Sequence, residues 1–118
     1  MAVTDFVSAL NSTTEIELTT IGRVSGREIS RPVWFVRRDE KLYLLPLAGS
    51  QSQWYKNLLR TPMIRLAAHG TQYSEAGNPV TGPEEVGQVI DDFRTKYGAR
   101  EVAGYYTSPD VAVEVMLG

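Results

Sequence analysis

The sequence predicts a mainly β domain with flanking helices, in which an antiparallel sheet of about six strands is joined by two or three helices. Three observations lead to this prediction. Charged and apolar residues alternate over residues 15–21, which is typical of a half-buried strand. Asp39 and Glu40 form a hairpin turn between two apolar runs. One long segment has helical spacing, with apolar residues at Val86, Val89, Ile90, Phe93 and Tyr97.

The N-terminal half is predicted to form a short helix followed by two hairpins. The helix covers residues 4–10, with Thr4 or Asp5 as its cap. The hairpin segments are a strand over 15–21, a turn over 22–26, a strand over 29–36 and a strand over 41–47. Pro32 cannot donate a hydrogen bond to a sheet ladder, so we expect an edge strand or a bulge at that point. The strand over 41–47 is apolar on both faces, which favours a central position.

The second half is predicted to alternate helices and strands. In order, these elements are a helix over 53–59, strands over 64–68 and 71–80, a helix between Thr81 and Gly98, and a strand over 111–117. Ser52 or Ser50 is the expected cap of the first of these helices. Residues 77–79 are expected to end or bend their strand. Thr81 and Glu84 match a capping box at the start of the long helix.

The composition is that of one globular domain over residues 1–118. The chain has no cysteine, which excludes a disulfide scaffold, a thiolate metal site, a cysteine nucleophile and an iron–sulfur cluster. A single histidine argues against a His-based metal site, so we expect no metal. The first ten residues lack the features of a signal peptide, and no stretch is long and apolar enough for a membrane span. We therefore expect a cytoplasmic protein.

The charges are unevenly distributed along the chain. Five arginines and one acid lie between Arg23 and Arg38, a local charge of +4, whereas eight acids and three bases follow from Glu75 onward, a charge of −5. The overall charge is −2. A nucleic-acid-binding domain is usually basic overall, so this pattern favours a local anion site over nucleic-acid binding.

Three segments are candidates for binding an anion and a flat ring. The turn over 22–26 contains two glycines, whose backbone N–H groups can converge on an oxyanion beside Arg23 and Ser25. The loop over 48–52 precedes a helix N-terminus. Aromatic residues near them are Trp34, Trp54 and Tyr55. Each signal also has an ordinary structural interpretation, respectively a hairpin turn with a solvated arginine, simple helix capping and core packing.

Two stretches in combination are more specific: LTTIGRVSGREISRPVWFV, and LYLLPLAGSQSQWYKNLLRTPMIRL. Together they resemble the deazaflavin-dependent nitroreductase family, a branch of the flavin- and deazaflavin-binding split β-barrels related to pyridoxamine phosphate oxidase. The resemblance covers residues 16–66. It implies a split β-barrel homodimer that binds coenzyme F420 and passes a hydride to a small-molecule acceptor, such as a nitro compound, a quinone or another activated organic molecule.

The resemblance also implies roles for individual residues. Those expected to hold the phosphate and the tail of the coenzyme are Arg23, Val24, Ser25 and Gly26 in the turn, Arg31 and Pro32 beside it, and Trp54, Tyr55 and Asn57 in the following helix. Those expected to place backbone N–H groups near the ring are Leu47, Ala48 and Gly49. Trp34 and Tyr106 would face the acceptor, with Tyr106 as the candidate proton donor.

The sequence departs from the family at Val24, where many members have lysine or arginine. The alternatives on the same barrel are an FMN-binding oxidoreductase, a haem protein, or a carrier of the cofactor without catalytic activity. A hydride carrier needs little acid–base machinery from the protein, so one histidine and no cysteine are compatible with an enzyme.

Overall fold

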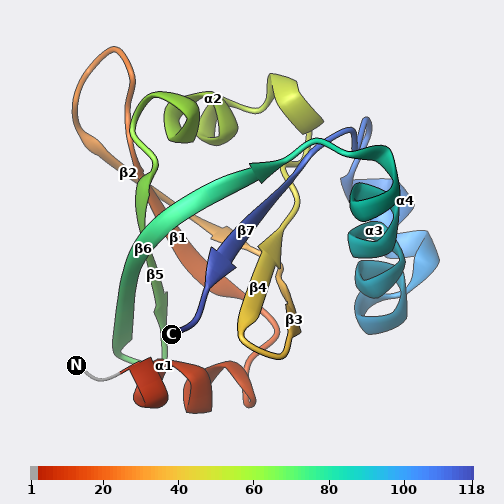
Figure 1. Cartoon of the computed structure of the whole chain (residues 1–118), viewed down its shortest axis with the longest axis horizontal. Helices are drawn as coiled ribbons and strands as arrows, with labels where there is room; N and C mark the ends of the chain where they lie inside the picture. Colours follow the sequence, from red (N-terminus) through yellow and green to blue (C-terminus); the bar gives the residue numbers. More distant parts are fainter. Residues whose placement is uncertain (1–2) are drawn as a thin grey trace.

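The computed structural model describes residues 3–118 and shows a curled antiparallel sheet with helices at both ends and along one side (Figure 1). Its seven strands follow the order β2-β1-β5-β6-β7-β4-β3. They are β1 (Ile16–Ile21), β2 (Glu28–Val33), β3 (Val36–Arg38), β4 (Lys41–Leu44), β5 (Met63–Ala68), β6 (Thr71–Val80) and β7 (Ala112–Met116). The helices are α1 (Val3–Leu10), α2 (Gln53–Arg60), α3 (Pro83–Tyr97) and α4 (Ala99–Tyr105), with a 3-10 turn, η1, at Gly49–Gln51.

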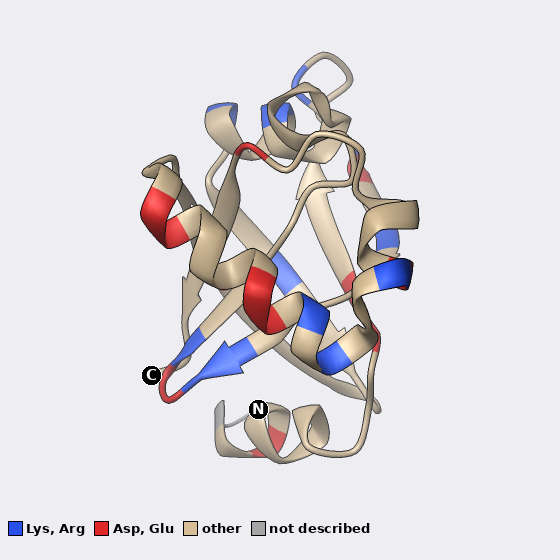
Figure 2. Ribbon diagram, turned by 90° about the vertical axis from the view of Figure 1, so that its right-hand side faces the viewer, with Lys and Arg blue, Asp and Glu red and all other residues tan. Residues whose placement is uncertain are grey.

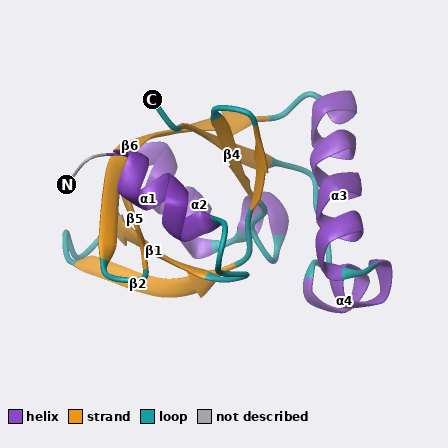
Figure 3. Ribbon diagram, turned by 90° about the horizontal axis from the view of Figure 1, so that it is seen from below, coloured by secondary structure: helices purple, strands orange, loops and turns teal. Residues whose placement is uncertain are grey.

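The sheet forms a half-barrel with one hydrophobic core on each side. The concave side is closed by α1 and α2, which lie at opposite ends of the curl (Figures 1 and 3). The convex side of β3, β4 and β7 is covered by α3 and α4. In β4, Leu42 and Leu44 belong to the concave core, whereas Tyr43 packs on the side of α3. The predicted central strand with two apolar faces is therefore confirmed, although it ends at Leu44 and not at residue 47.

Strand β6 joins the two halves of the sheet, and Gly77 marks the transition. Residues 71–76 pair with β5, and residues 77–80 pair with β7. A Cβ at Gly77 would lie 2.5 Å from Leu58 Cδ1 and 3.0 Å from Val113 Cγ1, so only glycine leaves room for α2 to pack here. The expected irregularity at residues 77–79 is thus a bend within a continuous strand.

The predicted strand over 29–36 is two strands, because the peptide of Phe35 leaves the sheet ladder to bond with α3. The Tyr97 hydroxyl accepts a hydrogen bond from Phe35 N at 3.0 Å. It lies 2.9 Å from Phe35 O and 2.7 Å from Thr14 O, and either carbonyl can accept the hydrogen bond that it donates. Lys96 Nζ donates to Phe35 O at 2.8 Å and lies 3.4 Å from the centre of the Phe35 ring. As predicted, β2 with Pro32 is an edge strand.

Two further expectations need correction. The long helix begins at Pro83 with Gly82 as its N-cap and without a capping hydrogen bond, so Thr81 and Glu84 form no capping box. Helix α4 was not predicted from the sequence. It follows α3 after Gly98, whose φ of 100° is rare for any other residue and turns the chain sharply. Helix α2 does begin after Ser52, as expected, but α1 already includes Thr4 and Asp5.

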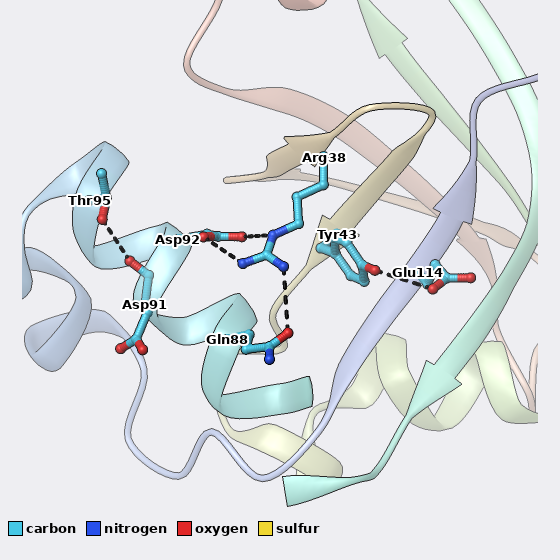
Figure 4. Close-up of polar contacts among 7 residues, drawn as sticks. All are labelled: Arg38, Tyr43, Gln88, Asp91, Asp92, Thr95 and Glu114. Carbon is cyan, nitrogen blue, oxygen red and sulfur yellow. Dashed lines mark hydrogen bonds and ion pairs between the residues drawn. The ribbon is translucent and has the colours of Figure 1, made fainter. Parts of the chain in front are cut away.

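Helix α3 is attached to the sheet by polar contacts as well as by its apolar face (Figure 4). The Arg38 guanidinium donates two hydrogen bonds to the Asp92 carboxylate and contacts Gln88. Tyr43 on β4 donates to Glu114 on β7 at 3.3 Å.

No helix within residues 3–118 is long and apolar enough to cross a membrane, and the same residues contain no group of three or more side chains suited to hold a metal ion.

Replacing Gly77 with alanine is expected to lower the free energy of unfolding by about 1–3 kcal/mol, because the added methyl group overlaps Leu58 in a filled core. Urea denaturation measures the change. Gly87→Ala is the matched control. Gly87 lies inside α3 with open space beside it, so the same substitution should stabilise the protein by up to about 1 kcal/mol. Equal effects at both positions would show that Gly77 has no special role in the bend.

The pKa values of Lys96 and Tyr97 predict a maximum in stability at about pH 10, where the effect of Lys96 is nearly complete and that of Tyr97 begins. Burial lowers the pKa of Lys96 from 10.5 to about 8, so between these values the unfolded chain binds a proton that the folded chain has released, and stability rises with pH. Burial raises the pKa of Tyr97 from 10.0 to about 12, so above pH 10.0 the unfolded chain loses its proton first and stability falls. Thermal unfolding between about pH 7 and 11 tests this pattern. Lys96→Met should abolish the rising limb, and Lys56→Met should leave it intact.

Candidate functional site

Two adjoining cavities open between β2, α2 and α4, and they share Arg31 and Trp54 in their walls. The first has a volume of about 370 Å³ and a mostly aromatic and aliphatic lining. The second has a volume of about 420 Å³ and lies beside the β1–β2 turn, with Arg23 and Asn57 in its wall. Volumes of this size are typical of small-molecule sites. Because they share walls, the two cavities form one groove with an aromatic end and a basic end.

The aromatic cavity is built from side chains that far-apart segments contribute. Trp34 enters from the β2–β3 link, Trp54 from α2, and Tyr105 and Tyr106 from the end of α4. Trp34 is held firmly, because its ring stacks on Tyr97 at 4.2 Å and meets Tyr105 edge-on at 4.7 Å. The hydrogen bonds between Tyr97 and Phe35 therefore also fix the wall of this cavity.

Tyr106 combines a buried ring with an available hydroxyl group. Its side chain is 6% exposed and packs edge-on against Phe93, while its hydroxyl makes no hydrogen bond to any residue of the described chain. Burial raises the pKa of this phenol well above its ordinary value, so it carries its proton throughout the physiological range. Tyr106 can therefore donate a hydrogen bond or a proton to a molecule in the cavity.

The basic cavity depends on a contact between the β1–β2 turn and α2. Asn57, which is 3% exposed, accepts hydrogen bonds at Oδ1 from Arg23 N (3.1 Å) and from the Arg23 guanidinium (2.8 Å). The same guanidinium donates to Gln53 Oε1 at 2.7 Å. All these acceptors are neutral, so the charge of Arg23 is oriented but not neutralised by a carboxylate.

Arg31 lies at the junction of the two cavities. Its side chain extends from the edge strand β2, is exposed, and makes neither a hydrogen bond nor an ion pair with the residues in the 3–118 range. Its guanidinium is therefore available to a ligand.

A polar strap joins the loops that carry the cavity walls. The Asp110 carboxylate accepts hydrogen bonds from Ser50 N at 2.8 Å and Ser50 Oγ at 2.7 Å, and these bonds lower its pKa. Thr107 N donates to Leu47 O at 3.1 Å. A side chain at Gly49 would collide with Ser108 and Asp110, so glycine is required where the strap crosses. The strap keeps the end of α4 close to the loop before α2.

Most of the predicted site residues line the two cavities. Those in the aromatic cavity are Arg31, Pro32, Trp34, Leu47, Trp54 and Tyr106, and those in the basic cavity are Arg23, Val24, Ser25, Arg31, Trp54 and Asn57. Val24 is 95% exposed at the tip of the turn. It contributes no charge, so Arg23 and Arg31 supply the charge of this end of the groove.

Four predicted residues lie outside both cavities: Gly26, Ala48, Gly49 and Tyr55. The backbone N–H groups of Ala48 and Gly49 donate to Ser52 Oγ and Pro46 O, so they are not free to bond to a ring. That they lie near a ring stays a prediction. Tyr55 packs in the concave core.

The arginines of the basic stretch over residues 23–38 lie in two separate places in the structure (Figure 2). Arg38 pairs with Asp92 and Arg37 bonds to Asp39 O at the β3–β4 hairpin, away from the arginines near α2 (Figure 2).

Sequence reasoning missed Glu15 and Tyr105, which line the aromatic cavity, and Gln53 and Ile29, which line the basic one. The sequence pattern indicates for Glu15 only a place in the alternation of residues 15–21, and Tyr105 lies on α4, which the sequence does not predict. That the aromatic cavity adjoins the basic cavity is visible only in the folded chain.

Solved structures with the same architecture include proteins of different described functions. An F420-H2 dependent reductase (FDR-A) matches with a TM-score of 0.67 at 17% identity, over 86% of this chain and 93% of the other. A haem storage protein, HutZ from Vibrio cholerae, matches with a TM-score of 0.71 at 15% identity, over 98% and 89% of the two chains. A putative pyridoxamine 5′-phosphate oxidase from Listeria innocua matches with a TM-score of 0.71 at 11% identity, over 97% and 91%.

These structures are similar in fold and share few residues with this chain, so they establish the architecture alone. The predicted split β-barrel of the pyridoxamine phosphate oxidase type is thereby confirmed. No curated protein matches the sequence. One family model matches, over residues 7–116, and it covers both cavities and nearly the whole sheet. The chain therefore belongs to the DUF2255 family, described as an uncharacterized protein conserved in bacteria.

Proposed function

We propose that this protein is an oxidoreductase that binds the deazaflavin coenzyme F420 and serves hydride transfer to an activated organic acceptor, such as a nitro compound or a quinone. One observation carries the proposal: an aromatic cavity and a basic cavity adjoin at Arg31 and Trp54. A molecule with a flat ring and an anionic tail fits such a groove. The split-barrel fold, which a reductase described as F420-H2 dependent shares, supports the same conclusion.

The residues present fit the ring of such a coenzyme. Trp54, Leu47, Pro32 and Trp34 provide apolar surface in the wall of the aromatic cavity. When bound in its reduced form, the coenzyme supplies a hydride. The protein must then hold ring and acceptor in contact and keep water out, which aromatic walls accomplish. The strap between Asp110 and Ser50 keeps these walls together.

The residues of the basic cavity fit the anionic tail. Arg23 is aimed by Asn57 and Gln53, and Arg31 is free to pair with an incoming anion. Ser25 lies in the same wall and adds a hydroxyl group. Hydrogen bonds from arginine to a phosphate or carboxylate are among the strongest in proteins, so these residues would provide much of the affinity.

Tyr106 is the proposed proton donor to the acceptor. A two-electron reduction that begins with a hydride needs a proton at the neighbouring atom of the product. Tyr106 keeps its proton because burial raises the pKa of its hydroxyl, and this hydroxyl is not used by another residue of the described chain. Trp34, locked against Tyr97, would form the surface on which the acceptor rests.

FMN is the second candidate, because it also joins a flat ring to a phosphate and would use the same two cavities. Haem ligated by histidine does not fit this groove. The chain contains one histidine, His69, which lies at the β5–β6 turn beside Ser12 and lines neither cavity. A carrier of the cofactor without catalytic activity would show tight binding and no acceptor reduction.

We further propose that the chain forms a homodimer. Leu59 on α2 and Met63 on β5 are each more than half exposed, and β2 presents an open edge. Exposed apolar side chains and an unpaired strand edge favour association with another copy.

Fluorescence titration of the purified protein with F420, and separately with FMN, tests the coenzyme. We expect F420 to bind, and Arg31→Gln to weaken binding by about 1.5–3 kcal/mol through the loss of a charge-assisted hydrogen bond. The melting temperature should not change, since the Arg31 side chain bonds to no described residue. Arg37→Gln, at the distant hairpin, is the control and should bind normally. A preference for FMN, or binding of neither molecule, would refute the deazaflavin assignment.

Tyr106→Phe should lower the turnover of an acceptor with reduced F420 by about 100-fold, without weakening coenzyme binding, because only the proton-donating hydroxyl is removed. The ratio of wild-type to variant rates should stay constant between about pH 6 and 9, since the phenol remains protonated there. Tyr73→Phe, which removes the hydroxyl of a tyrosine that lines neither cavity, provides the control and should leave turnover unchanged. Full turnover in Tyr106→Phe would reduce Tyr106 to a wall residue.

A further inference from the structure

Among the residues that the structure describes, Glu15 is the one carboxylate in the walls of the two cavities. It lies directly before β1, one residue beyond the pair that Ile16 forms with Val33, and so next to Trp34, which directly follows β2. It forms no ion pair within residues 3–118. Its negative charge reaches Tyr97, where it contributes to the raised pKa of that phenol.

The groove therefore has charges of opposite sign along its length. Arg31 pairs with Leu18, whereas Glu15 lies three residues before Leu18 in the chain, just outside β1. At about 3.3 Å per residue, this offset separates the two positions by about 10 Å along the sheet. Over such a distance in a partly apolar groove, the two charges act on different parts of a bound molecule. The basic end attracts anionic groups, and the end at Glu15 repels them.

The surroundings of Glu15 strengthen this preference. Tyr105, Tyr106 and Trp54 line the same cavity, and aromatic faces attract organic cations through their ring quadrupoles. The ring of Tyr105 is available to a ligand, because the residue is 57% exposed at the mouth of the cavity. A carboxylate beside several aromatic side chains is the chemical composition of sites that bind quaternary or aromatic ammonium groups.

We propose that Glu15 makes the aromatic end of the groove select planar organic cations, such as pyridinium or aryl-ammonium compounds, over anionic analogues of the same shape. The inference rests on the proposed function only in treating this ligand as the acceptor. It concerns binding, so it can be measured in the protein without coenzyme and without turnover.

The two tryptophans of the chain, Trp34 and Trp54, both line this cavity, so their fluorescence reports the entry of a ligand. Three naphthoquinones serve as probes: the neutral parent, its sulfonate and a trimethylammonium derivative. At low salt we expect the wild-type protein to bind the cation about tenfold more tightly than the sulfonate. Glu15→Gln should reduce this ratio by about threefold to tenfold and leave the affinity for the neutral parent unchanged.

Glu17→Gln is the matched control, since Glu17 is an exposed carboxylate on the same strand that lines neither cavity. It should leave the ratio unchanged. An equal fall of the ratio in both variants, no change in Glu15→Gln, or no binding of any probe by the wild-type protein would each overturn the inference.

The coenzyme titration separates this inference from the proposed function. A protein that binds F420 but treats the two charged probes alike refutes the role of Glu15 alone. A protein that prefers the cation through Glu15 but binds neither F420 nor FMN refutes the proposed coenzyme and retains the inference.

Discussion

The close contact between Gly77 and Leu58 is the constraint on which the rest of the structure depends. Strand β6 must leave β5 and join β7 at this point, and the missing side chain lets α2 pack directly against the bend. Because Leu58 packs against Gly77, the preceding turn of α2 places Trp54 and Asn57 in the wall of the groove. The location of the candidate site thus follows from how the sheet is continued through a bend.

A second anchor acts at the other end of the groove. Tyr97 holds both the N–H and the carbonyl of Phe35, and Lys96 adds a further bond to the same carbonyl. These contacts interrupt the edge strand and direct Trp34 toward the cavity, where the ring of Tyr97 covers one of its faces. Helix α3 therefore supports the aromatic wall, although no residue of α3 lines the cavity. Stability and site geometry are linked through one phenol group.

The architecture is shared by proteins described as an F420-H2 dependent reductase, a haem storage protein and a putative pyridoxamine 5′-phosphate oxidase, so the fold alone selects no cofactor. The lining of the groove is more selective. Its arginines, which no described carboxylate neutralises, suit an anionic tail, and its aromatic walls suit a flat ring. His69, the one histidine of the chain, lines neither cavity. The side chains that face the cavities, and not the fold, therefore indicate which ligand the groove suits.

The sequence by itself determined most elements of the fold, because each depends on local periodicity or on a single turn residue. The alternation of β1 and β7, the spacing of α3 and the edge position of the Pro32 strand were all predicted correctly. The resemblance of residues 16–66 also led to Arg23, Arg31, Trp54 and Asn57, since these lie in a continuous motif.

What tertiary structure alone decided are contacts between distant segments. The strand is interrupted at Phe35 because Tyr97 bonds to this residue. The N–H groups of Ala48 and Gly49 find their acceptors only within the folded loop. Glu15 becomes part of a cavity wall only when folding brings Tyr105 and Tyr106 to the same cavity. Such contacts have no periodic signal, because the free energy that selects them comes from groups that meet only after the chain has folded.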